Sequence, residues 1–355
     1  MGTAVYGFVV LSVLVLAVAA AALFMARSES VLDEALDSAV RKRTEAAGQD
    51  FARALHADWA DLKYLSGAID GSDLDGIGEV MAGMRGDGTR ISWIGYAGVD
   101  GTVREASDGL LVGADVSERP WFRNGLRSGF AGDVHEAVLL ANLLRPEGGE
   151  PLRFVDLALP VKNLEGDLTG VLGMHIDAGW AERSLAEMAR SLGIDLYLIS
   201  QSGEIVMSST GTTAGVEEVM QLASARSGAE ASGRAEWSDG REYFTTLVPN
   251  LSYADLPNFG WRLAGRLDAG TFQAGLHSLV GSAALAAALA LAVLALLTFL
   301  FVLIFIRPID ALVDSATQLA AGEDAYPRER NSTREAAQLS AALARLQARR
   351  KISGS

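Results

Sequence analysis

The residues with the clearest chemical potential form the phrase Arg119-Pro120-Trp121-Phe122, which places a guanidinium beside two large aromatic rings. A guanidinium presents a rigid fork of donors that matches a carboxylate bidentately. Trp121 and Phe122 would supply an apolar wall and floor that exclude water from this contact. The same residues also fit a structural role, in which Arg119 pairs with Asp115 and Trp121 fills a core. The phrase therefore predicts either a carboxylate-binding pocket or a packed corner of a domain.

The remaining chemistry-bearing residues form no recognisable catalytic motif. The sequence has no P-loop, no G-x-S-x-G elbow, no H-E-x-x-H and no G-x-G-x-x-G. Two of the four histidines, His56 and His277, are expected to be structural or solvated. The types of four further residues would suit a metal site, but their spacing does not establish that they converge: His135, Glu136, His175 and Asp177. We therefore predict no enzyme activity, no resident cofactor and no metal.

Composition excludes several other classes of protein. The chain has 355 residues, enough for two or three domains, and half of them are apolar. It contains no cysteine, which excludes disulfide scaffolds, cysteine zinc sites and thiol catalysis. Its net charge of −14 argues against a general nucleic-acid binder.

Two uncharged segments, Ala4–Met25 and Leu279–Ile306, exceed the roughly 20 residues that a helix needs to cross a bilayer. The first lacks a basic leader, which favours an uncleaved anchor over a signal peptide. The tail from Arg307 onward has eight basic and six acidic residues, a net charge of +2, which leaves −16 for the rest. Positive charge beside a span favours the cytoplasm. We therefore expect a multi-pass membrane protein with the loop 26–278 outside.

This external loop opens with a long amphipathic helix and continues as short strands. Apolar residues recur at helical spacing from Val31 to Leu65. Strand patterns follow in two groups, which predict one unit at about 70–180 and another at about 190–267. The strand segments of these groups are Ile91–Val99, Phe154–Val161, Val171–Ile176, Ile194–Ser200, Ile205–Ser208, Tyr243–Val248 and Trp261–Leu267.

The layout resembles the double-Cache sensor domains of bacterial transmembrane receptors. The Arg119 phrase looks like the family's R-x-W-[YF] ligand motif, the stretch 155–177 like its closing strand pair, and Gly260-Trp261 like the start of its last strand. The resemblance implies an α+β fold in which tandem PAS-like modules stack on a long N-terminal helix. It also implies that Arg119 clamps a ligand carboxylate in the distal module, where an aspartate of that family accepts the ligand ammonium.

This sequence departs from the family at the ammonium acceptor, where it has His175. Asp177, two residues on, either restores an acidic partner or orients His175. Phe122 lacks the hydroxyl of the family's tyrosine. We therefore predict a small carboxylate-bearing solute rather than a standard α-amino acid. The predicted ligand-binding residues are Arg119, Trp121, Phe122, His135, Asp156, His175 and Asp177.

An apolar stretch at Val134–Leu144 has no counterpart in the resemblance, where this loop is short and polar. It fits a lid over the pocket with His135 and Glu136 pointing inward, but it fits a packing insertion or a dimer contact equally well. The sequence leaves these alternatives open.

The tail resembles a HAMP domain, because two short amphipathic helices joined by a connector follow Arg307-Pro308 directly. Neither helix has enough apolar area to fold alone, so two chains are expected to form a parallel four-helix coiled coil. The alternative is a helix lying on the lipid surface. The predicted segments are a membrane helix at 1–26, the sensor at 27–278, a second membrane helix at 279–306, HAMP at 307–351 and a tail at 352–355.

These observations predict the input half of a homodimeric membrane receptor. The expected partners are a small-molecule ligand, the membrane and a second copy of the chain, with no nucleic acid. A diguanylate cyclase, a histidine kinase or a chemotaxis module would supply the output. An anchored extracytoplasmic enzyme and a scaffold with a degenerate pocket remain as alternatives.

Overall fold

The computed structural model describes residues 2–69, 74–136, 140, 144, 152–211, 231–323 and 333–353. The chain divides into two compact units. One unit is Asp33–Phe272, and the other combines Met1–Leu32 with Gln273–Ser355. Each unit is described by itself below.

Two five-stranded antiparallel sheets form the body of Asp33–Phe272, so the predicted α+β class is confirmed. The first sheet has the order β2-β1-β5-β4-β3 and the second β7-β6-β10-β9-β8, which is the same order of strands along the chain. The unit therefore contains one structural module twice, here called the distal and the proximal module. The distal strands are β1 (Ile91–Gly98), β2 (Val103–Ala106), β3 (Phe130–Glu136), β4 (Arg153–Lys162) and β5 (Leu168–Asp177); the proximal strands are β6 (Asp195–Ile199), β7 (Ile205–Ser208), β8 (Ala231–Glu236), β9 (Glu242–Val248) and β10 (Arg262–Asp268).

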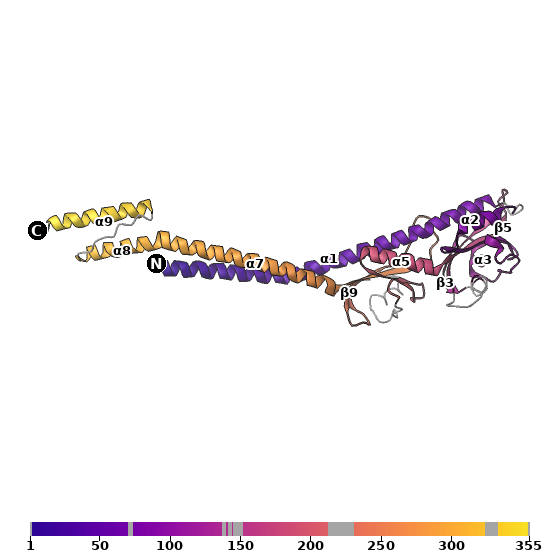
Figure 1. Cartoon of the computed structure of the whole chain (residues 1–355), viewed down its shortest axis with the longest axis horizontal. Coiled ribbons are helices and arrows are strands. Elements are labelled where there is room, and N and C mark those ends of the chain that lie inside the picture. The colour runs from indigo at the N-terminus through magenta and orange to yellow at the C-terminus, as the bar shows by residue number, and fades with distance from the viewer. Residues whose placement is uncertain are drawn as a thin grey trace. The chain divides into compact units, whose positions relative to one another are not determined.

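The long helix predicted from the apolar spacing is present as α1 (Gly2–Ala68), and within this unit it runs along both modules (Figure 1). Its apolar stripe is buried, as the period of 3.6 residues requires: Leu36, Val40, Phe51, Leu55, Leu62 and Leu65. On the proximal side the Phe51 ring lies 6.3 Å from that of Trp261. On the distal side Asp58 pairs with Arg90 at 2.8 Å.

Local sequence explains why β4, β5 and α5 (Ala178–Leu192) follow one another. The turn between the strands is closed by the Asn163 side chain, which accepts hydrogen bonds from the backbone N–H groups of Glu165 and Asp167. Gly166 occupies the left-handed conformation there, with φ 93°. Helix α5 starts at Ala178, because the Asp177 carboxylate caps it by accepting from Trp180 N–H at 2.6 Å.

Short elements complete the distal module: α2 (Ile77–Arg85), a 3₁₀ turn η1 (Ser107–Gly109) and α3 (Pro120–Gly125). Helix α3 starts with Pro120 at its first position, where a missing N–H costs nothing. Its residues Trp121 and Phe122 enter the core between the helix and the sheet. The arginine–tryptophan phrase thus lies at the start of a helix that covers β4 and β5.

The other unit is helical. It contains α7 (Ala269–Phe301) from Gln273 onward, a π-helical segment η4 (Val302–Ile306), α8 (Arg307–Ala320) and α9 (Arg334–Ser353). Among the described residues, the helical segment Leu285–Ala320 is long and apolar enough to cross a membrane, and Gly7–Ala20 is a shorter apolar helix. Apolar side chains of α1 and α7 face each other inside this unit, around Val13 and Leu294. A membrane span is indicated here by the length and composition of the helices alone.

Candidate ligand-binding site of the distal module

A small cavity of about 70 Å³ lies in the distal module beside β1, β3, β5 and α3. Pockets for drug-sized ligands typically begin near 300 Å³, so this cavity suits an ion or a solute of few atoms. Its lining combines aromatic rings, two imidazoles and one guanidinium. The lining residues are Trp93, Leu111, Ala114, Asp115, Val116, Arg119, Pro120, Trp121, His135, Leu140 and His175.

Arg119 is exposed and lines this cavity from the residue before α3. The structural alternative paired it with Asp115, but that carboxylate instead accepts a hydrogen bond from Ser117 N–H at 2.9 Å. This hydrogen bond lowers the pKa of Asp115. Within the described part of the chain, Arg119 has no ion pair or side-chain hydrogen bond. Its donors are therefore available to an anion.

Trp121 and Phe122 are both buried in the distal core, but only Trp121 also lines the cavity, and the predicted site residue Phe122 does not. The Trp121 ring lies 5.6 Å from that of Trp93. Two glycines paired across β1 and β5 make room for these indoles. A Cβ added at Gly95 would lie 2.1 Å from Trp93, and one added at Gly173 would lie 2.7 Å from Trp121. Trp93, absent from the predicted set, is thus part of the site.

His175, which lines the cavity, forms a buried pair with Asp156, and the two residues are exposed by only 4% and 3%. The strands β4 and β5 place them directly opposite each other, and His175 Nδ1 lies 2.5 Å from Asp156 Oδ1. The imidazole stacks on Trp93 with ring centres 5.0 Å apart and an angle of 27°. Because buried polar groups are costly unless satisfied, this hydrogen bond accounts for the stability of an imidazole among aromatic rings.

His135 approaches the same carboxylate from β3. The β3–β4 register shifts between Gly132 and His135, and such a bulge changes the direction of a side chain. His135 Nε2 lies 3.6 Å from Asp156 Oδ2, and His135 Nδ1 lies 3.3 Å from the carbonyl oxygen of Asp133. The Asp133 carboxylate is held in turn by Trp261 Nε1–H at 2.7 Å, from the proximal module. One side chain of each of three adjacent strands therefore converges on one point.

The predicted site residue Asp177 and the predicted lid residue Glu136 lie elsewhere. Asp177 caps α5 and lies 3.7 Å from Arg183, so Asp156, and not Asp177, orients His175. The strand pleat turns Glu136 away from His135, and Glu136 is exposed opposite Arg153 on β4. Of the predicted lid 134–144, residues 134–136 belong to β3, while Leu140 is buried and lines the cavity. The rest of that segment lies outside the described residues, apart from Leu144.

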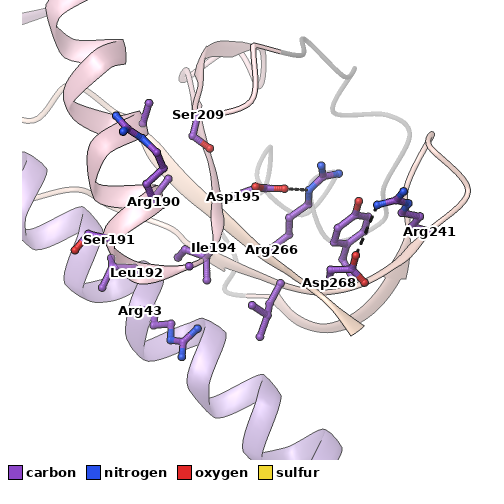
Figure 2. Close-up of a pocket in the computed structure, with 15 residues that line it drawn as sticks. Arg43, Arg190, Ser191, Leu192, Ile194, Asp195, Ser209, Arg241, Arg266 and Asp268 are labelled. Carbon is purple, nitrogen blue, oxygen red and sulfur yellow. Dashed lines mark hydrogen bonds and ion pairs between the residues drawn. The ribbon is translucent and has the colours of Figure 1, made fainter. Parts of the chain in front are cut away.

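A second, larger concavity of about 720 Å³ lies in the proximal module (Figure 2). It is bordered by Arg43 of α1, by Arg190 near the end of α5, and by the sheet around Arg266. Much of its charge is internally compensated. Arg266 Nε lies 2.8 Å from Asp195, and Arg241 Nη1 lies 3.8 Å from Asp268. This open surface, whose charges pair with one another, is a weaker candidate for a specific site than the smaller distal cavity, which is less open.

The proximal module also has a residue at the position of His175. In the distal sheet, His175 of β5 lies opposite Trp93 on one neighbouring strand and Asp156 on the other. At the corresponding position of the proximal sheet, Arg266 of β10 lies opposite Asp195 and Thr245. The Arg266 guanidinium lies 4.0 Å from the ring centre of Tyr243 and 4.3 Å from that of Trp237. Burial and a hydrogen bond to Asp239 raise the pKa of Tyr243 to about 12. A side chain of the chain itself thus fills the proximal counterpart of the distal site.

Comparison with known proteins finds similarity in structure alone. No family model matches the chain, and no curated protein matches it. One similar solved structure is the ligand-binding domain of the Pseudomonas aeruginosa PAO1 amino acid chemoreceptor PctB with L-Arg, with a TM-score of 0.54, 15% identity and coverage of 73% of this chain and 99% of that one. Another is the extracellular domain of rpHK1S-Z16, named as a histidine kinase, with a TM-score of 0.50, 12% identity and coverage of 71% and 99%. A third is the ligand-binding domain of the Pseudomonas fluorescens chemoreceptor CtaA with L-leucine, with a TM-score of 0.50, 13% identity and coverage of 68% and 98%.

The repeated five-stranded module on a long helix is the double-Cache fold. The resemblance inferred from the sequence is therefore confirmed for the sensor fold. At 12–15% identity these structures establish the fold and not a ligand. The HAMP domain, the dimer and the output type stay predictions.

Proposed function

We propose that this chain is the input part of a transmembrane receptor whose distal module binds a small carboxylate-bearing solute outside the membrane. The observation that carries the proposal is the small distal cavity, where the Arg119 guanidinium and the imidazoles of His135 and His175 line one space. Solute binding would alter the conformation of the sensor. The membrane helices and the HAMP coiled coil would pass this change to a cytoplasmic output.

The chemistry of the cavity supports a carboxylate as the recognised group. Arg119 is a permanent cation with no ion pair among the described residues, and a guanidinium matches a carboxylate bidentately. Imidazoles at the other end can donate or accept a hydrogen bond, unlike the ammonium-binding aspartate of the resembling receptors. The small volume favours solutes of few heavy atoms, such as short hydroxy- or keto-acids.

Signalling requires more than binding, because a ligand shifts a conformational equilibrium only by its difference in affinity for the two states. A coupling free energy of about 1–3 kcal/mol would change output several-fold. Contacts between the modules offer a route for this coupling. The Asp133 carboxylate, two residues from His135, accepts a hydrogen bond from Trp261 of the proximal module.

The test is calorimetric titration of the full chain in detergent with formate, acetate, lactate, pyruvate, succinate and a set of L-amino acids. Losing one member of a buried charged contact typically costs about 2–5 kcal/mol. Arg119→Ala should therefore weaken binding of the best solute by roughly 30-fold or more, at about 1.4 kcal/mol per decade. Arg123→Ala is the matched control, because Arg123 lies on α3, one turn after Arg119, but pairs with Glu118 at 3.5 Å. Equal affinity of the two variants would refute the role of Arg119.

A further inference from the structure

His135, Asp156 and His175 come from three adjacent strands, and one ligating atom of each lies within 4.8 Å of the others. Two imidazoles and a carboxylate form a ligand set that zinc and other late divalent metals prefer. No other group of three such side chains converges in this way among the described residues of the chain. We propose that this cluster binds a divalent transition-metal ion, of the zinc class, inside the distal cavity.

The spacing of the ligating atoms supports a metal over a simple hydrogen-bond network. His135 Nε2 and Asp156 Oδ2 are 3.6 Å apart, beyond the usual upper limit of about 3.2 Å for an N–H···O hydrogen bond. Two ligands that lie about 2.0–2.1 Å from a tetrahedral zinc ion are roughly 3.3 Å apart. The distance between His135 Nε2 and Asp156 Oδ2 is thus close to the distance between two ligands of one metal ion. The other carboxylate oxygen of Asp156 bonds His175 Nδ1, whose proton a metal ion would displace.

The surroundings of the cluster fix its imidazoles as in known metal sites. A ligating histidine usually directs its other ring nitrogen to a carbonyl or carboxylate, which sets the orientation of the ring. His135 Nδ1 faces the carbonyl oxygen of Asp133 in this way. His175 is fixed by stacking on Trp93 and by burial among aromatic rings. His135 already lies near ligand spacing from Asp156, whereas His175 Nδ1 and Asp156 Oδ1, 2.5 Å apart, would have to separate by roughly 0.8 Å to share an ion.

Charge and volume connect the ion to the proposed solute. Three protein ligands leave at least one position of a tetrahedral ion for water or for a solute oxygen. A divalent ion bound by one carboxylate keeps a net positive charge. Arg119, which lines the same cavity, adds a second positive charge. An anion between them would balance both charges. The inference rests on the proposed function in that it names a further component of the same sensory site.

The test uses the full chain in detergent, without a polyhistidine tag, titrated with Co²⁺ and followed by its visible absorption. We expect one Co²⁺ per chain with the intense bands of tetrahedral coordination, displaced by one equivalent of Zn²⁺. His135→Ala should weaken binding by roughly 100-fold or more, and this half-exposed residue can change without disturbing the core. Asp156→Asn should have a similar effect. His56→Ala is the matched control, because His56 contacts Asp255 on another surface.

No stoichiometric Co²⁺ binding, or binding that His135→Ala and Asp156→Asn leave unchanged, would overturn the proposal and indicate an adventitious ion only. The two proposals fail separately. Co²⁺ binding without any carboxylate binding would reject the proposed solute and leave the metal site intact. Arg119-dependent carboxylate binding in metal-free protein, with no Co²⁺ bound, would retain the receptor function and reject the metal.

Discussion

Asp58 should make the stability of the sensor fall as the pH rises from about 4 to 7. Its carboxylate is 3% exposed between α1 and the distal module, and Arg90 is its ion-pair partner. Burial outweighs the attraction of Arg90 and raises the pKa of Asp58 from 3.8 to about 6. A folded state with the higher pKa binds the proton more tightly than the unfolded chain does. The stabilisation is therefore complete below pH 3.8 and is lost as the pH rises through 6.

The size of the effect follows from the same values. Each pH unit between the two pKa values is worth about 1.36 kcal/mol, so ionising Asp58 costs the folded state about 3 kcal/mol by pH 7. Asp58→Asn keeps an oxygen that accepts from Arg90 but removes the ionisation. The free energy of unfolding of the wild type, minus that of the variant, should thus fall by about 2–3 kcal/mol between pH 4 and pH 7.

Urea denaturation of the full chain in detergent, followed by tryptophan fluorescence from pH 4 to 8, measures this difference. Asp50→Asn is the control, because Asp50 also lies on α1 but forms an exposed pair with Arg53. Its pH profile should parallel that of the wild type. A constant difference between Asp58→Asn and wild type would refute the reasoning. A difference that grows with pH would mean that the ion pair with Arg90 outweighs burial.

Three further predictions test packing, topology and assembly. Gly265→Ala should destabilise the proximal module by about 2 kcal/mol or more in thermal unfolding, because the new Cβ would lie 1.9 Å from a buried threonine oxygen on α1. Gly67→Ala, with nothing within 4 Å, should not, and equal melting temperatures would refute this packing. Alkaline phosphatase fused at residue 150 should be active and at residue 330 inactive, and the reverse pattern would contradict the orientation. Leu339→Asp should reduce crosslinking between cysteines placed beside it in two chains, whereas undiminished crosslinking would contradict the coiled coil.

The sequence predicted more of the fold than of the candidate site. Period-2 and period-3.6 patterns predicted α1, the β4–β5 hairpin and the two strand groups, because these elements bury apolar residues at regular spacing. The same hairpin contains an unused signal. A turn centred on Glu165-Gly166 places Asp156 directly opposite His175, so the partner of the imidazole could have been deduced from register.

The convergence of His135 was beyond such reasoning. Strand alternation separates His135 from Glu136, but the register shift after Gly132 decides where His135 lies relative to Asp156. A bulge depends on tertiary packing and leaves no clear mark in one sequence. For Asp177 the strand alternation was a poor guide. It predicts that Asp177 shares a face with His175, but the Asp177 carboxylate caps the start of α5.

Comparison of the two modules supports our proposal that the distal one binds the ligand. Both modules place a cationic or ionisable side chain at the same register position of the last strand, His175 in one and Arg266 in the other. Arg266 is paired with Asp195 and packed against three aromatic rings, so this side chain is already engaged by the protein's own residues. The distal module instead keeps a cavity with Arg119 unpaired among the described residues. A ligand can change the balance between two conformations only where the protein has left contacts unmade, and of these two sites the distal one has them.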